Sequence, residues 1–176
     1  MPKKQPMNIY QKITSKNGLR LNDKIMEGFL SHYQRDDIHK THLFGGRYEN
    51  IYLTAQEIPA LGELVAEATQ QAEDILQLKS LRAGFWFNFM PPGSTTTLHT
   101  HDDDDELLSA VYYVDVPEDS GNLILVEKSD SPIPRKIEIT PAAGEFVFFK
   151  PDLPHEVSSN NSAQSRLSIG FNFGQS

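Results

Sequence analysis

The alternation of apolar and polar residues changes its period near Gly84. Before this point, apolar residues recur at helical spacing in two segments, residues 23–35 and 57–82. In the second segment the apolar positions form one helical face: Ile58, Leu61, Leu64, Val65, Ala68, Ala72, Ile75 and Leu76. Between the two segments, residues 42–53 contain Gly45-Gly46 and favour a bent strand or a hairpin. Residues 1–83 are therefore expected to be mainly helical.

From Gly84 onward, the chain consists of short segments rich in aromatic and β-branched residues. Proline and glycine turn signals separate these segments, as in Pro91-Pro92-Gly93 and in residues 151–154. About eight strands in about 90 residues predict a mainly β fold, a barrel or jelly roll. We expect residues 84–176 to form this jelly-roll core, buttressed by two or three N-terminal helices within a single domain of residues 1–176.

The composition of the chain limits the classes of function that it can have. Hydrophobic residues make up 38% of the chain and charged residues 23%, which is typical of a globular protein. The formal net charge is −8, and five of the 24 acidic residues lie at positions 102–106, so much of the acidity is local. The absence of a basic patch argues against nucleic acid as a partner. Because the sequence has no 18-residue apolar stretch and no signal peptide, we expect no membrane span and a cytoplasmic location.

The stretch "TLHTHDDDDE" is the densest group of metal-ligand side chains in the sequence. The chain has no cysteine, so any metal must be bound by nitrogen and oxygen ligands. Residues two apart on a strand point to the same face, which brings together His99, His101 and, if the strand continues, Asp103. Two imidazoles and a carboxylate suit a divalent transition metal such as iron, manganese or zinc.

His155 is the leading further ligand. It follows an apolar strand and a proline-flanked turn in "EFVFFKPDLPHEV", whereas His32, His39 and His42 lie in the part of the chain expected to be helical. Taken alone, His155 is more typical of a barrel rim, and the acidic run is more typical of a solvated loop. Their combination on one predicted barrel favours a metal site.

Arg166 and Ser168 lie two apart in the strand "SRLSIGFNF", opposite Leu167 and Ile169. If Arg166 points into the barrel it requires an anion, because an unpaired buried guanidinium is costly. Its planar fork suits a carboxylate, and Ser168 adds a hydroxyl donor. If it points outward, it pairs with a surface acid, and the strand pattern by itself favours neither orientation.

Together these residues resemble the iron(II)- and 2-oxoglutarate-dependent oxygenase superfamily, in particular its prolyl-hydroxylase-like members. The resemblance covers about residues 84–174 and rests on an H-x-D pair, a distal histidine and an R-x-S segment: His101-Asp102-Asp103, His155 and Arg166-Leu167-Ser168. It implies a double-stranded β-helix, iron(II), 2-oxoglutarate and molecular oxygen. The activity implied is hydroxylation of a substrate, coupled to decarboxylation of 2-oxoglutarate to succinate.

The resemblance also implies roles for individual residues. His101, Asp103 and His155 would hold the iron, while Arg166 and Ser168 would bind the far carboxylate of 2-oxoglutarate. Asn88 is a candidate for the chelating end of the cosubstrate, although a strand asparagine more often faces solvent. Tyr113 is a lining candidate that is more typical of a core, and Arg47 and Tyr48 belong to a candidate substrate-covering loop.

A second register of the histidine cluster remains open. Gly93, His99, His101 and Glu106 resemble a first cupin motif, although its following glycine is missing and the second cupin motif fits poorly around His155. The facial triad of two histidines and one carboxylate on non-haem iron favours Asp103, with His99 as an alternative ligand or as a residue that orients one. A cupin-type metalloenzyme without a keto acid and a non-catalytic metal-binding barrel are the competing functions.

The substrate is not encoded in any motif that we recognise. A small molecule, a free amino acid and a peptide side chain all fit the sequence, and the oligomeric state is open. We interpret the acidic run 102–106 as a solvated rim, in preference to an entrance that selects a cationic substrate.

Overall fold

The computed structural model describes residues 8–101, 105–127 and 133–176. Asp103, the carboxylate favoured from the sequence as an iron ligand, lies outside the described residues. The described chain forms two helices and eleven strands, in the order β1 (Tyr10–Thr14), α1 (Gly18–His32), β2 (Lys40–Phe44), β3 (Arg47–Ile51), α2 (Ala60–Leu76), β4 (Leu81–Met90), β5 (Thr96–His99), β6 (Glu106–Asp115), β7 (Leu123–Glu127), β8 (Arg135–Ile139), β9 (Glu145–Phe149), β10 (His155–Val157) and β11 (Arg166–Gln175).

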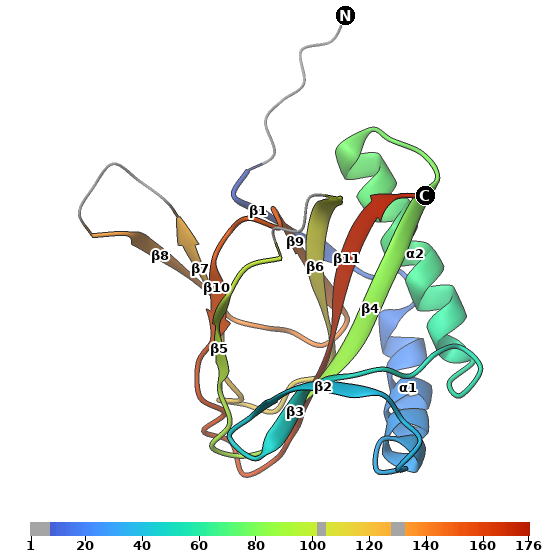
Figure 1. Cartoon of the computed structure of the whole chain (residues 1–176), viewed down its shortest axis with the longest axis vertical. Coiled ribbons are helices and arrows are strands. Elements are labelled where there is room, and N and C mark those ends of the chain that lie inside the picture. The colour runs from blue at the N-terminus through green and yellow to red at the C-terminus, as the bar shows by residue number, and fades with distance from the viewer. Residues whose placement is uncertain (1–7, 102–104, 128–132) are drawn as a thin grey trace, which may run out of the picture.

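The strands form two antiparallel sheets. The larger sheet has the order β1-β9-β6-β11-β4-β3-β2, and the smaller has the order β5-β10-β7-β8. Figure 1 shows the smaller sheet on one side of the larger and both helices on the other side. The mainly β jelly roll buttressed by helices is confirmed, as a double-stranded β-helix whose larger sheet also takes in three strands from residues before Leu81.

Side chains that alternate along the central strands explain why the larger sheet packs against the helices on one face and against the smaller sheet on the other. On β11, Leu167, Ile169 and Phe171 are fully buried and belong to the core shared with the helices. The helices contribute one apolar stripe each to that core: Leu21, Ile25 and Phe29 from α1, and Leu61, Leu64, Ala68 and Ala72 from α2. The alternate positions of β11 face the smaller sheet. Each buried leucine or phenylalanine side chain contributes about 1.5–3 kcal/mol, so this core fixes which face of β11 looks inward.

The helix ends differ from the sequence-based expectation. α1 begins at Gly18 rather than at residue 23, because its buried stripe already starts with Leu21. α2 ends at Leu76, where Gln77 adopts a left-handed conformation (φ 55°) and its N–H bonds to the carbonyl of Glu73. In the part of the chain that the structure describes, no helix has the length and apolar character needed to cross a membrane. Strand β1 was not foreseen, because this edge strand is largely exposed and shows no clear alternation.

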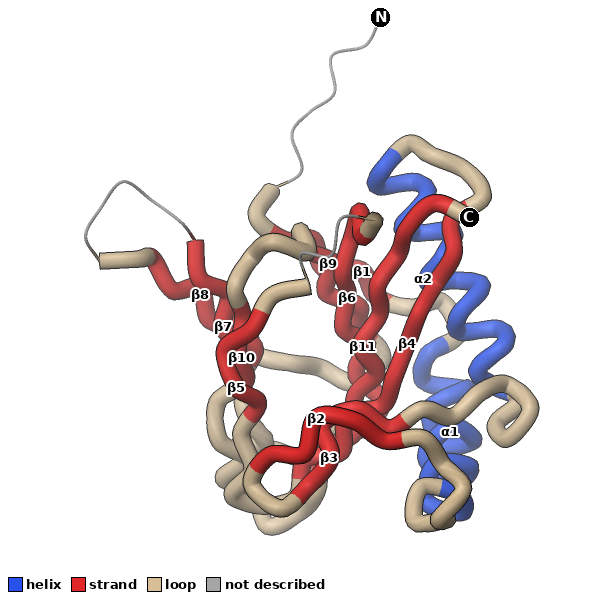
Figure 2. Tube along the Cα trace, viewed as in Figure 1, coloured by secondary structure: helices blue, strands red, loops and turns tan. Residues whose placement is uncertain are grey.

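The expected hairpin around Gly45-Gly46 is confirmed as β2–β3. Both glycines have positive φ, 57° and 79°, which suits the two-residue turn between Phe44 and Arg47. The hairpin is attached to the rest of the larger sheet through the pair Ile51↔Phe87. Figure 2 shows it at the lower end of β4, where it extends toward the side of the smaller sheet. His42, which had been set aside as a ligand candidate with the rest of the mainly helical N-terminal part, lies on β2 of this hairpin.

Candidate metal and cosubstrate site

Three histidines converge between the two sheets. β5 ends at His99 and β10 begins at His155, and the two residues are partners in the strand register. His101 lies two residues after His99 in the chain. One ring nitrogen from each of the three histidines lies within 4.8 Å of a ring nitrogen of the other two. The ring centroids are 4.3 Å apart for His99 and His155, and 5.1 Å apart for His101 and His155. The structure thus brings together His101 and His155, as predicted, and adds His99.

The hydrogen bonds of two of these rings set their tautomers. Nδ1 of His99 donates to the carbonyl of Thr97 (2.6 Å), and Nδ1 of His155 donates to the carbonyl of Leu153 (2.9 Å). A carbonyl can only accept, so in both rings the proton is on Nδ1 and the lone pair is on Nε2. Metal-binding imidazoles are oriented in this way by a backbone carbonyl. The backbone N–H of His101 donates to the carbonyl of Pro151 (2.8 Å), which anchors the third histidine.

Burial keeps the imidazole of His155 neutral. His155 is 5% exposed, and desolvation lowers its pKa to about 3, with a further contribution from the neighbouring His99 and His101. A neutral imidazole binds a metal without first losing a proton. Three imidazole nitrogens form a donor set that suits Fe(II), so the residues present fit the metal that the resemblance implies.

Glu106, the fourth ligand of the cupin alternative, is engaged elsewhere. Its Oε1 accepts a hydrogen bond from Nη1 of Arg82 at 3.2 Å, and it does not belong to the histidine cluster. The set of ligands expected for a cupin centre is therefore not assembled among the described residues.

Arg166 points into the space between the sheets and is 1% exposed. Nη1 donates to the carbonyl of Gly121 (2.9 Å), Nη2 contacts Sδ of Met90 (3.0 Å), and Nε has no hydrogen-bond partner among the described residues. Within the described residues, no carboxylate lies within ion-pair distance of this guanidinium, and burial lowers its pKa from the ordinary value. A buried cation without a counter-charge is costly, so this position calls for an anionic ligand.

The strand register places a row of polar side chains beside Arg166. Ser168 on β11 is paired with Asn88 on β4 and with Tyr113 on β6. Tyr113 is 1% exposed, and its ring centroid lies 5.7 Å from Cζ of Arg166. Burial raises the pKa of Tyr113 to about 12, so the phenol keeps its proton at neutral pH and can donate a hydrogen bond to an anion.

These side chains line one cavity with the histidines. We call its inner part the deep pocket, which contains His99, His101, His155, Arg166, Ser168, Tyr113 and Asn88. Asn88 does not face solvent: Oδ1 accepts from Nη1 of Arg47 (3.2 Å) and Nδ2 donates to Oγ1 of Thr96 (3.3 Å). Tyr113, a lining candidate that its sequence context made more typical of a core, does line this pocket, where the strand order places it next to Ser168.

An outer pocket continues from the histidines toward the hairpin. It shares Trp86, Asn88, Thr96, His99 and His101 with the deep pocket, and adds His42, Glu49, Asn50, Tyr52, Thr97, Thr100 and Asn172. Trp86 stands between the two parts, with its ring centroid 5.3 Å from that of His101. Gly170 makes room for it, because a Cβ at this position would come within 2.6 Å of the indole. No sequence motif pointed to Glu49, and His42 had been set aside.

Comparison with known proteins agrees with this geometry. A family model described as "Putative 2OG-Fe(II) oxygenase" matches residues 84–172, half of the chain. A search of curated proteins found no match.

Solved structures share the fold. A prolyl-4-hydroxylase from Pseudomonas putida is 20% identical, with 96% of this chain and 94% of that chain covered and a TM-score of 0.73. A prolyl hydroxylase from Trichoplax adhaerens, in complex with a hypoxia inducible factor peptide fragment, is 15% identical, with 96% and 84% covered and a TM-score of 0.70. The epimerase SnoN, in complex with Fe3+, alpha ketoglutarate and nogalamycin RO, is 14% identical, with 96% and 79% covered and a TM-score of 0.71.

The family match covers the strands that carry the histidine cluster and Arg166, and the fold similarity extends over almost the whole chain. Iron and 2-oxoglutarate, which fit the imidazole cluster and the unpaired guanidinium, are the cofactor and the cosubstrate of this family. The chain belongs to the 2OG-Fe(II) oxygenase family and is an iron(II)- and 2-oxoglutarate-dependent dioxygenase.

Proposed function

We propose that this enzyme hydroxylates a small molecule, an amino acid or a peptide side chain, with iron at the histidine cluster and 2-oxoglutarate against Arg166. The observation that carries this assignment is the buried Arg166, which has no counter-charge among the described residues and lies in the same pocket as three imidazoles. Bound iron and 2-oxoglutarate supply the oxidising chemistry, in which 2-oxoglutarate is decarboxylated to succinate while the substrate is oxidised by molecular oxygen.

The side chains of the deep pocket bind and orient the cosubstrate. Its far carboxylate accepts hydrogen bonds from the guanidinium of Arg166 and from the hydroxyls of Ser168 and Tyr113. Its keto-acid end then faces the histidines, where Asn88 is an additional donor. Val157, Leu123 and Phe149 supply apolar walls that limit the access of water.

For the third iron ligand we propose His99. The sequence favours Asp103 by analogy with the two-histidine, one-carboxylate triad. His99 is supported by its position opposite His155 and by the carbonyl that holds its Nε2 free for a metal. The interpretation of the acidic run 102–106 as a solvated rim stays a prediction, because residues 102–104 lie outside the described part of the chain.

The remaining expectations about partners and location stay predictions. We expect no nucleic-acid partner and no membrane association, and a cytoplasmic location.

An anaerobic titration tests the metal and cosubstrate assignments together. Apo-protein receives iron(II) and then 2-oxoglutarate, while the weak visible charge-transfer band of a chelated keto acid is recorded. We expect the band in the wild type and in Asp103→Ala, and an iron affinity reduced about 100-fold or more in His99→Ala. Loss of the band in Asp103→Ala, with retention in His99→Ala, would assign the third ligand to Asp103. Iron binding without any band in the wild type would support a cupin-type centre instead.

A further inference from the structure

Glu49 is a buried carboxylate that faces the outer pocket. It lies on β3, it is 8% exposed, and its Oε1 is shielded from solvent and has no hydrogen-bond partner in the part of the chain that the structure describes. Leaving a buried carboxylate oxygen unsatisfied costs about 1–3 kcal/mol or more. An unsatisfied buried carboxylate oxygen calls for an explanation, and a ligand that supplies the missing donor is one.

Arg47 is the nearest cation, and it does not satisfy this oxygen. Its Nη2 is 3.6 Å from Oε1 of Glu49, beyond hydrogen-bond distance. The same guanidinium donates to Oδ1 of Asn88, to the carbonyls of Phe89 and Thr95, and to Oγ1 of Thr96. Arg47 itself lines a separate groove beside Gly93 and Thr95 and does not line the outer pocket. The N–H groups of Arg47 therefore serve to hold the hairpin against β4 and β5.

Glu49 is the carboxylate in the described lining of the outer pocket, and its ion-pair partner Arg47 lies behind it, outside that lining. Among the described residues that line this pocket there is no lysine or arginine, and the histidines at its inner end are the proposed metal ligands. Trp86 and Tyr52 offer aromatic rings, and Asn50, Asn88 and Asn172 offer neutral amides. A carboxylate among aromatic rings is an environment that favours a cation, since the ring faces are also attractive to positive charge.

We propose that Glu49 binds an ammonium or guanidinium group of the primary substrate, so that the enzyme oxidises an amine- or guanidine-bearing molecule. This inference rests on the proposed function, because the outer pocket ends at His99 and His101, where the oxidised carbon would meet the iron. A cation held by Glu49 fixes one end of the substrate, and the neighbouring carbon chain passes Trp86 toward the histidines.

The single tryptophan of the chain makes this proposal directly measurable. Trp86 lines both pockets, so its fluorescence reports on ligands in the outer pocket without turnover. The protein loaded anaerobically with iron(II) and 2-oxoglutarate is titrated with n-butylguanidine, with n-butylamine and with the neutral n-butylurea. We expect saturable fluorescence changes with the two cations and at least about tenfold weaker binding of the urea.

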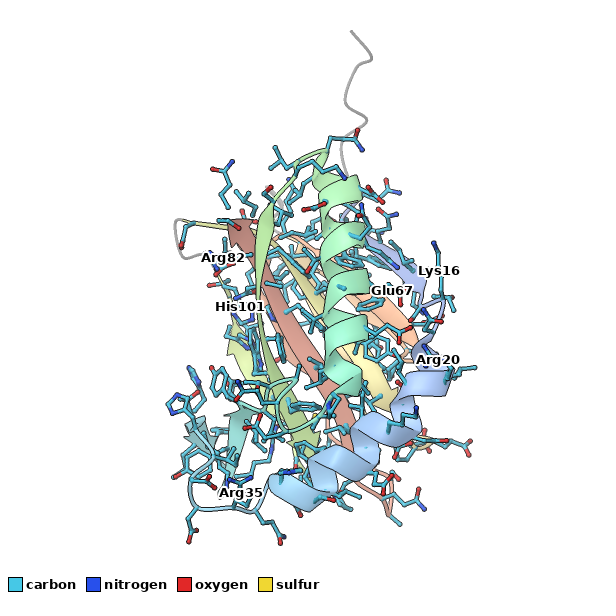
Figure 3. The ribbon with its side chains drawn as sticks, turned by 90° about the vertical axis from the view of Figure 1, so that its right-hand side faces the viewer. Lys16, Arg20, Arg35, Glu67, Arg82 and His101 are labelled. Atoms are coloured by element: carbon cyan, nitrogen blue, oxygen red, sulfur yellow. The ribbon has the colours of Figure 1, made fainter. Side chains whose placement is uncertain are left out.

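Variants of similar size test the role of the charge. Glu49→Gln should weaken cation binding about tenfold or more and abolish the preference over n-butylurea, whereas Glu49→Asp should retain the preference. Glu63→Gln is the matched control: Glu63 pairs with Arg20 on the helical side, and Figure 3 shows Arg20 far from His101. Equal binding of cation and urea by the wild type, the absence of saturable binding, or unchanged cation binding in Glu49→Gln would overturn the proposal.

The visible band separates this inference from the proposed function. If the band forms normally but cations show no preference, the substrate class is wrong while the cosubstrate assignment stands. If the band does not form, the proposed function itself fails.

Two further probes distinguish free from peptide-borne cations. Free L-arginine and L-lysine are compared with acetylated, amidated tripeptides that carry either residue in the centre. Tighter binding of the free amino acids indicates a small-molecule substrate, and tighter binding of the tripeptides indicates a protein side chain. Glu49→Gln should weaken whichever binds.

Discussion

The deep and outer pockets each contain one buried charge with an unsatisfied atom, but the two charges are held very differently. Arg166 is on β11, a ten-residue strand paired along its length with β4 and β6 in the centre of the larger sheet. Glu49 is on a five-residue strand of a hairpin that joins β4 through the pair Ile51↔Phe87. The pocket proposed for the cosubstrate is thus built into the sheet, and the pocket proposed for the substrate lies beneath an edge hairpin. Edge elements vary with little cost to the core, which suits a part that determines specificity.

Replacing Arg166 should produce the largest difference between the two pockets. In Arg166→Met, we expect the affinity for 2-oxoglutarate to fall about 100-fold or more, because the far carboxylate loses its charged donor. The unfolding temperature of the apo-protein should stay equal or rise, since the variant no longer buries an unpaired guanidinium. Anaerobic titration and thermal unfolding measure the two effects.

A matched control for this variant is Arg20→Met, on the surface pair with Glu63. It should leave cosubstrate affinity unchanged. A marked loss of stability in Arg166→Met would show that the guanidinium stabilises the fold. This result would contradict the prediction that Arg166 serves the cosubstrate and not the stability of the apo-protein.

The burial of His155 should make the deep pocket sensitive to acid. Its pKa is lowered to about 3 in the folded protein, so between about pH 6.5 and 3 the unfolded chain takes up a proton that the folded chain does not. The stability of the apo-protein is therefore fully present above pH 6.5 and falls as the pH drops. We expect a loss of about 2 kcal/mol by pH 5.

Urea unfolding at pH 7.5 and pH 5 measures this loss, with His155→Gln as the reference. The wild type should lose about 2 kcal/mol more than the variant over this interval. An equal loss in both proteins would mean that His155 is protonated, or solvated, in the folded state.

Removing hydrogen bonds that hold the β2–β3 hairpin against β4 and β5 should have a smaller effect on stability and binding. Arg47→Lys keeps the positive charge but cannot reproduce the forked hydrogen bonds to Asn88, Thr95 and Thr96. We expect a loss of stability of about 1–2 kcal/mol and severalfold weaker binding of n-butylguanidine, with an unchanged 2-oxoglutarate band. If Arg47→Lys weakens the binding of n-butylguanidine and of 2-oxoglutarate equally, the hairpin supports both pockets and not the outer pocket alone.

Several misses in the sequence analysis have one cause, which is the sequence distance between the partners involved. β1 is an edge strand whose exposed residues show little alternation, and it pairs with β9 more than a hundred residues later. His42 and Glu49 become functional candidates only because the hairpin folds back over the end of β5. Tyr113 was a lining candidate from the sequence, but its place beside Ser168 follows only from the strand order, in which β6 and β4 flank β11. No local pattern specifies these neighbours.

The sequence by itself determined which side chains share a face. The period of two along a strand is local, so it paired Arg166 with Ser168 and His99 with His101 before any tertiary contact was known. Only the tertiary structure decided that these faces turn inward, because that choice depends on the apolar residues of the helices that cover the opposite face of the sheet. It also placed His155 opposite His99, and it placed Glu49 in the wall of the outer pocket. Both placements depend on strand order and register, which are set by contacts between residues far apart in the chain.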